Sequence, residues 1–223
     1  MSIIVSDLEG TLTTGSSWRG LRRYFRMHYD AWAYDRFFLK WIAIFPLVQL
    51  GIMNRREVMT SWMLDEISLF RGNSPQKFNK MAEWVVENTM WPNRRKDVLL
   101  EINLHRQNGA KVAIVSGAYQ PIAEAFARRM DAISIGSPLI FQNGKLEGVT
   151  LPINSYEHKR KNIQDQLSDA KIASAYGDTT SDIPMMEMSA DPVAVYPSKH
   201  LRQIAEKRNW RILDEHSGSV VVS

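Results

Sequence analysis

Between residues 92 and 213 the chain alternates short apolar runs with segments of helical spacing, and this alternation restricts the fold more than any other feature. A further β-branched run, Ile3 to Ser6, lies near the N-terminus. Strands that alternate with helices form a parallel sheet covered on both faces. We therefore expect an α/β fold of three layers. The expected elements are strands 3–6, 111–115, 132–135, 172–176, 193–195 and 210–213, helices 121–130, 159–167 and 201–207, and a small hairpin over 141–146.

Residues 15–87 differ in character from the rest of the chain. Aromatic and basic residues dominate there, Trp18, Leu21 and Phe25 recur at helical spacing, and no run has the character of a strand. The chain therefore divides into a core, residues 1–14 plus 88–223, and an all-helical insertion, residues 15–87. Because the insertion follows the loop after the first strand, we expect it to lie over the carboxyl edge of the sheet as a cap domain.

Two pairs of carboxylates each follow a predicted strand. Asp7 and Glu9 come after the first strand, and Asp178 and Asp182 come after the strand 172–176. Since ligands gather at the carboxyl ends of parallel strands, we expect the two pairs to converge at one edge of the sheet. Hard oxygen ligands in this arrangement suit Mg2+, which keeps waters and substrate phosphate oxygens in its remaining positions. The sequence thus predicts a magnesium site.

A hydroxyl and a lysine lie between the two acidic pairs in sequence. Ser116 is at the end of the strand 111–115, and either Lys159 or Lys161 is able to neutralise a phosphate group. An acid, a hydroxyl, a lysine and a second pair of acids in this order indicate phosphoryl chemistry.

These segments resemble the motifs of the haloacid dehalogenase (HAD) superfamily. Asp7-Leu8-Glu9-Gly10-Thr11-Leu12-Thr13 resembles its first motif, Asp-x-Asp-Gly-Thr-Leu-Thr. Residues 112–117 are similar to its second motif, and residues 176–185 to its fourth, Gly-Asp-x-x-x-Asp. The helical insertion between the first two motifs is similar to that of the branch containing phosphoserine phosphatase. The resemblance covers the core, and the cap matches only in position and helical character.

The resemblance implies a Rossmann-like core and a Mg2+-dependent phosphatase for a small phosphate monoester. Asp7 would attack phosphorus and become an aspartyl phosphate. Ser116 and Gly117 would bind the phosphoryl group. A lysine would balance its charge; we choose Lys159, because family members place apolar residues one turn after the lysine and Ile163 follows Lys159 in this way.

The resemblance also implies the metal ligands. Asp7, Asp178 and the backbone carbonyl of Glu9 would hold Mg2+, with Asp182 beside it, directly or through water. Glu9 departs from the family pattern, in which an aspartate usually acts as general acid and then as general base. A carboxylate is retained, so we expect altered geometry with the proton chemistry preserved.

The substrate is left open by these motifs. Phosphoserine phosphatases place a glutamate shortly after the first motif, whereas residues 14–18 contain no acid, which argues against phosphoserine. The alternatives to hydrolysis are phosphotransfer to an alcohol acceptor and a binding module that has lost turnover.

Composition sets further limits. The 28 Lys and Arg against 24 Asp and Glu give a net charge of +4, too mild to indicate nucleic acid and suited to a small phosphorylated substrate. No cysteine is present, so thiolate and Cys-zinc chemistry are excluded. The N-terminal residues do not form a signal-peptide pattern, and we expect a cytoplasmic enzyme.

One apolar run stands out inside the insertion. Residues 37–53 are more apolar than a small cap needs, although Lys40 and Pro46 interrupt the run, which is marginal in length for a membrane span. We expect a buried hairpin of cap helices. The alternative is a surface that contacts a membrane or an acyl chain, which would favour a phospholipid-like or lysolipid phosphate substrate.

Overall fold

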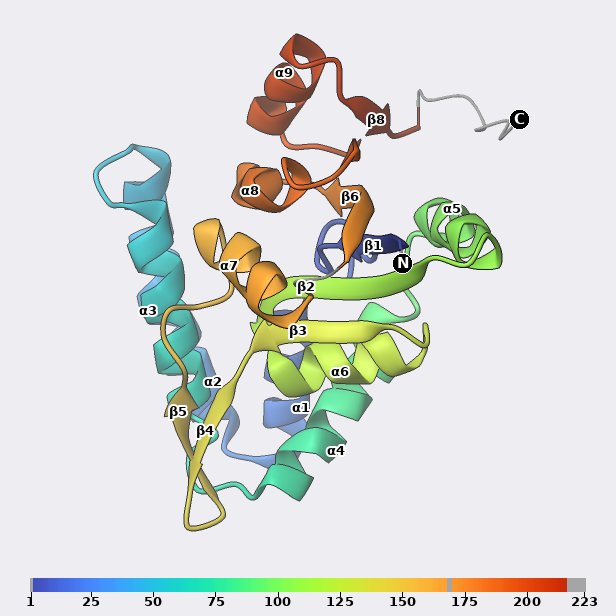
Figure 1. The fold of residues 1–223 in the computed structure, drawn as a ribbon. Coiled ribbons are helices and arrows are strands. Elements are labelled where there is room, and N and C mark those ends of the chain that lie inside the picture. The colour runs from blue at the N-terminus through green and yellow to red at the C-terminus, as the bar shows by residue number, and fades with distance from the viewer. Residues whose placement is uncertain (1, 168–169, 216–223) are drawn as a thin grey trace.

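A parallel six-stranded sheet forms the centre of the computed structural model, which describes residues 2–167 and 170–215 (Figure 1). The strand order is β3-β2-β1-β6-β7-β8. This arrangement confirms the predicted α/β class. The strands are β1 Ser2–Ser6, β2 Lys111–Tyr119, β3 Ile133–Ser137, β6 Lys171–Gly177, β7 Asp191–Val195 and β8 Arg211–Leu213.

Helices cover both faces of the sheet. Along β1, Ile4 belongs to one hydrophobic cluster, while Ile3 and Val5 belong to the other, because successive side chains of a strand point to opposite faces. The first cluster includes side chains of α5 and α6, and the second includes those of α7, α8 and α9. Three layers are thus present, as expected. The helix bounds are α5 Lys96–Gln107, α6 Gln120–Arg128, α7 Glu157–Gln166, α8 Ile183–Met186 and α9 Lys199–Lys207.

Four of the helices between β1 and β2 lie in the segment predicted to be helical, residues 15–87. Their bounds are α1 Ser17–His28, α2 Ala31–Gln49, α3 Arg55–Ser68 and α4 Pro75–Val85, and a π-helical turn at Val86–Met90 follows. Side chains that accept a backbone hydrogen bond begin three of these helices: Asp30 for α2, Asn54 for α3 and Ser74 for α4. Every residue from 15 to 87 is described, and no strand occurs among them.

A small antiparallel hairpin connects the sheet with the inserted helices. It consists of β4 Leu139–Gln142 and β5 Lys145–Val149. Its turn, Asn143-Gly144, has φ values of 50° and 72°, the left-handed conformation that this dipeptide favours. Leu146 of β5 exchanges two backbone hydrogen bonds with Gly72 and Asn73, which follow α3.

β2 is longer than the predicted strand 111–115. After a register shift it continues to Tyr119, which pairs with Ser137 of β3. Ser116 therefore lies inside the observed strand instead of after it. Among the helices of the described ranges, none is long and apolar enough to cross a membrane.

Candidate active site

Asp7 begins the loop that follows β1. Its backbone N–H donates to the carbonyl of Tyr176 in β6 over 2.9 Å, which aligns it with the end of the neighbouring strand. The loop then turns tightly at Gly10, where φ is 91°. A Cβ atom at Gly10 would meet Asp178 Oδ2 at 2.1 Å, so only glycine allows the approach. Thr11 Oγ1 donates to Asp178 Oδ1 over 3.2 Å and fixes that carboxylate.

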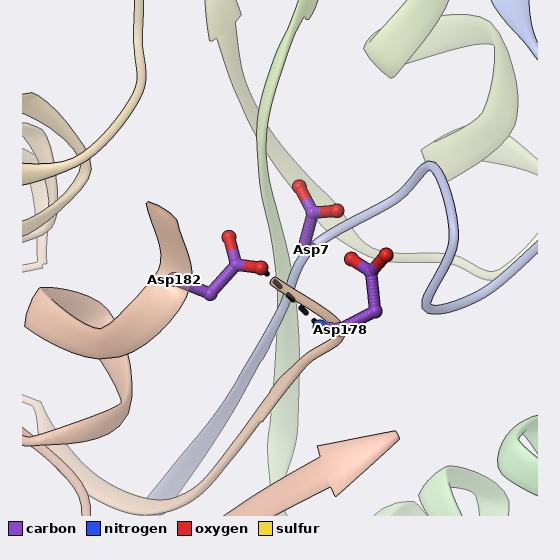
Figure 2. Close-up of side chains that lie close together, drawn as sticks. All are labelled: Asp7, Asp178 and Asp182. Atoms are coloured by element: carbon purple, nitrogen blue, oxygen red, sulfur yellow. Dashed lines mark hydrogen bonds between the residues drawn. The ribbon is translucent and has the colours of Figure 1, made fainter. Parts of the chain in front are cut away.

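Three aspartates converge at this edge of the sheet. Asp178 follows β6, and Asp182 ends a short 3-10 turn, Thr180–Asp182. Oxygen atoms of Asp7, Asp178 and Asp182 lie within 4.8 Å of one another. Figure 2 shows the three side chains lying close together, with the backbone N–H of Asp178 donating to Asp182 Oδ2 over 3.2 Å. Of the four acidic residues predicted to converge, three therefore have side chains that lie close together.

Lys159 of α7 completes this cluster. Its Nζ lies 2.6 Å from Asp7 Oδ1 and 2.6 Å from Asp182 Oδ1, and its side chain is 3% exposed. Burial alone would lower the pKa of Lys159, but the charges of Asp182 and Asp7 outweigh it and hold that pKa above its usual value. Lys161, the alternative lysine, is exposed.

Burial and mutual repulsion raise the pKa values of Asp7 and Asp178. Desolvation raises the pKa of Asp7 to about 6, although Lys159 partly offsets the effect. Desolvation, followed by the charges of Asp7 and Asp182, raises the pKa of Asp178 to about 8. Close carboxylates that resist ionisation together are stabilised by a cation between them. Three hard oxygen donors in this geometry therefore fit a divalent metal ion.

The side chain of Glu9 lies apart from this three-aspartate cluster. Its Oε1 accepts a hydrogen bond from the backbone N–H of Ser17, the first residue of α1, over 3.1 Å. Burial raises the pKa of Glu9 to about 7. The N-terminus of a helix favours a carboxylate, so α1 holds Glu9 in one position. Glu9 is therefore a buried carboxyl group held in one position, two residues after Asp7.

Ser116 and Gly117 are held in β2 by their surroundings. The Ser116 hydroxyl oxygen accepts from the backbone N–H of Ala118 over 3.2 Å. The carbonyl oxygen of Ser116 accepts from Asn154 Nδ2 over 3.0 Å, and that of Gly117 accepts from Ser137 Oγ over 2.9 Å. Asn154 also accepts at Oδ1 from Asn162 of α7, so it links the Ser116 segment to the helix that carries Lys159.

A buried carboxylate of the helical insertion was not predicted. Glu66 of α3 is 3% exposed, and it accepts hydrogen bonds from Tyr34 over 2.5 Å and from Tyr119 of β2 over 3.3 Å. Burial raises its pKa to about 7. The sequence did offer a signal, because Glu66 continues the helical spacing of Val58 and Trp62. The structure buries all three residues on one face of α3. Thr11, Asn154 and Ser17 were also missed.

The chain matches the family of haloacid dehalogenase-like hydrolases over residues 4–187, and it belongs to that family. A probable phosphatase of Mycobacterium tuberculosis is 26% identical over 192 residues, which cover 75% of this chain and 67% of the relative. A protein of the same organism named phosphoserine phosphatase is 26% identical over 224 residues, covering 93% and 69%.

Solved structures show the same fold. A Bordetella pertussis protein of unknown function has a TM-score of 0.76 at 19% identity, covering 96% of this chain and 98% of the other. A substrate-bound phosphoserine phosphatase has a TM-score of 0.64 at 16% identity, covering 96% and 93%. The family match and the phosphatases among the relatives confirm the predicted resemblance and the prediction of a HAD-type phosphatase.

Proposed function

We propose that the chain hydrolyses a small phosphate monoester with the help of Mg2+, through an aspartyl phosphate on Asp7. One observation carries this proposal: the buried Asp7 carboxylate contacts the ammonium group of Lys159 and also lies within 4.8 Å of the carboxylates of Asp178 and Asp182. A carboxylate nucleophile needs this balance, because neighbouring acids alone would keep it protonated.

The reaction has two steps. In the first, an Asp7 oxygen forms a bond to phosphorus while the ester P–O bond breaks, and Glu9 gives its proton to the leaving alcohol. In the second, Glu9 takes a proton from water, whose oxygen attacks phosphorus as the bond to Asp7 breaks. Phosphate leaves and Asp7 is regenerated. The Ser17 contact supports these roles, since it keeps Glu9 beside the start of α1.

The remaining site residues would bind the phosphoryl group and the metal. Lys159 would neutralise phosphoryl oxygens, with Ser116 and Gly117 of β2 donating hydrogen bonds to them. The side chains of Asp7, Asp178 and Asp182 and the backbone carbonyl of Glu9 would hold Mg2+. When bound, the ion neutralises negative charge on the phosphoryl group and the aspartates.

The proposal also assigns separate roles to two parts of the chain. Residues 1–14 plus 88–223 would form the catalytic core, and residues 15–87 would act as a cap over the site. Contacts across this division support it: the Tyr119 hydroxyl of β2 donates to the carbonyl of Met63 in α3 over 2.8 Å. A covered site excludes water that would compete with the leaving group for the proton of Glu9.

Phosphate release from an aryl phosphate with Mg2+ present tests the proposal. We expect Asp7→Asn to abolish turnover while it retains cooperative unfolding. Asp165→Asn, which changes an exposed acid of α7, is the matched control and should keep wild-type rates. Appreciable turnover by Asp7→Asn would falsify the mechanism. Adding an alcohol acceptor and measuring transfer products separates hydrolysis from phosphotransfer.

A further inference from the structure

Exposed apolar side chains concentrate on the hairpin formed by α2 and α3. Among the described residues, sixteen large hydrophobic side chains are exposed, and ten of them lie between residues 31 and 68. Figure 1 shows that the turn between these helices projects from the molecule. The ten are Trp32, Leu39, Ile42, Phe45, Leu47, Leu50, Ile52, Met53, Met59 and Leu64.

The end of this hairpin contributes no fully buried residue, although Ile44 and Val48 pack against the core. The buried residues of α2 are Tyr34, Phe37 and Trp41, and the next buried residue along the chain is Val58 of α3. We define the hairpin tip as residues 42–57, which include no buried side chain. At its turn, Leu50 and Ile52 are 73% and 68% exposed. A concentration of exposed apolar side chains such as this one is typical of a surface that binds a protein partner or a membrane.

Basic side chains outnumber acidic ones around the tip. Residues 36–57 contain four basic side chains and one acidic one, Glu57. The basic ones are Arg36, Lys40, Arg55 and Arg56, of which Lys40 forms an ion pair with Asp65 of α3 over 2.6 Å. Apolar residues flanked by basic ones are typical of segments that bind the headgroup region of anionic membranes.

This charge pattern decides between two occupants of the tip. A second copy of the chain, docked about a two-fold axis, would bring the same basic side chains against each other. An anionic lipid surface accepts the apolar groups and pairs with the basic ones. Since no helix in the described ranges is suited to spanning a bilayer, the contact would be interfacial.

We propose that the hairpin tip docks the protein on anionic lipid bilayers, with Leu50 and Ile52 inserted among the headgroups and Arg55 and Arg56 facing lipid phosphates. The tip adjoins the segment that leads to the active site, because the Arg56 guanidinium lies 5.1 Å from the ring centre of Tyr156, three residues before Lys159. The proposal is independent of the phosphatase mechanism, since it concerns binding alone.

Co-sedimentation with vesicles tests this proposal directly. The purified full chain is mixed with vesicles of phosphatidylcholine alone, or of phosphatidylcholine with phosphatidylglycerol, at low and high salt. We expect binding to the anionic vesicles that weakens with added salt, and little binding to the neutral ones. The double substitution Leu50→Glu with Ile52→Glu should weaken that binding at least about tenfold.

The matched control substitutions lie on α5 and α9, outside the hairpin tip. Leu100 and Leu104 of α5 are 66% and 42% exposed, so Leu100→Glu with Leu104→Glu makes the same chemical change away from the tip. Arg55→Glu with Arg56→Glu tests the charges, and Lys199→Glu with Lys207→Glu, at two exposed lysines of α9, controls for the same change in net charge. Both controls should bind vesicles as the wild type does.

Three outcomes overturn the proposal. The first is wild-type protein that stays in the supernatant with anionic vesicles, and the second is a tip variant that sediments with them as the wild type does. The third is a dimer, measured by light scattering without lipid, that the Leu50→Glu with Ile52→Glu variant converts to a monomer. That result would assign the tip to a second copy of the chain.

Discussion

The ammonium group of Lys159 lies 2.6 Å from Asp7 Oδ1, although the two residues are separated by 152 positions. The parallel sheet brings them together, because β1 delivers Asp7 to its carboxyl edge and α7 turns Lys159 back toward the same edge. Both side chains are buried, so their charges interact with little screening by water. Lys159 therefore favours the ionised form of Asp7, which the proposed mechanism requires of a nucleophile.

Lys159→Ala should lower kcat/KM by about 100- to 1000-fold, the usual loss for one charge-stabilising donor. The substitution leaves Asp7 beside Asp182 without a counter-charge, so protonation of Asp7 removes the nucleophile. Lys161→Ala changes the exposed lysine two positions later and should leave the rate unchanged. Steady-state kinetics of both variants decide the choice, and equal effects would show that neither lysine has the proposed role.

Glu9→Gln should lower kcat by about 100-fold or more, because it removes the proposed proton carrier but keeps the side-chain length. Glu9→Asp keeps the carboxyl group and should retain activity. The test is sharper with two substrates, one whose leaving alcohol has a high pKa and one whose leaving alcohol has a low pKa. Only the alcohol of high pKa is a poor leaving group that needs the proton. Equal rates for both variants and the wild type would assign proton transfer elsewhere.

Because of Glu66, we expect the free energy of unfolding of the protein to fall as the pH rises. Burial raises its pKa from 4.5 to about 7, so the folded state holds this proton more tightly than the unfolded chain. The resulting stabilisation is complete below pH 4.5 and is lost as pH rises through 7, a change of about 3 kcal/mol. Glu66→Gln mimics the protonated acid and should make the fall in unfolding free energy correspondingly shallower.

Urea unfolding between pH 4.5 and 8, with a chelator present, measures this effect. Glu57→Gln changes an exposed glutamate of the same helix and should follow the wild-type curve. If Glu66→Gln and the wild type lose stability in parallel, Glu66 is ionised in the folded protein throughout. Its contacts with Tyr34 and Tyr119 would then have to stabilise a buried carboxylate.

Local patterns were sufficient to predict the sheet. The β-branched run before Asp7 and the run before Ser116 became the adjacent strands β1 and β2, because apolar residues on both faces of a strand require a covered parallel sheet. The extension of β2 to Tyr119 was not predictable in this way. It depends on pairing with Ser137 of β3, a partner that local sequence does not specify.

The candidate site was predictable where the motif spacing is local. Spacing along α7 left two lysines open, but Lys159 and Ile163 are the buried residues of this helix, which supports the interpretation of that apolar spacing. Glu66 lies outside every motif. Its importance arises from hydrogen bonds to Tyr34 and Tyr119, which only the packing of α3 against the core provides.

We expect Asp178 to link stability to metal binding, which allows a test without turnover. Burial and the charges of Asp7 and Asp182 raise its pKa to about 8, so ionising it beside them costs folding free energy when no cation is bound. In a chelator, Asp178→Asn should therefore be as stable as the wild type or more stable.

Added Mg2+ should stabilise the wild type, by about 2.7 kcal/mol when the Mg2+ concentration is a hundred times the dissociation constant of the ion. Asp178→Asn should lose most of that gain, because a carboxylate ligand is missing. Thermal unfolding with and without Mg2+ gives both quantities, and an equal gain in the two proteins would place the metal elsewhere.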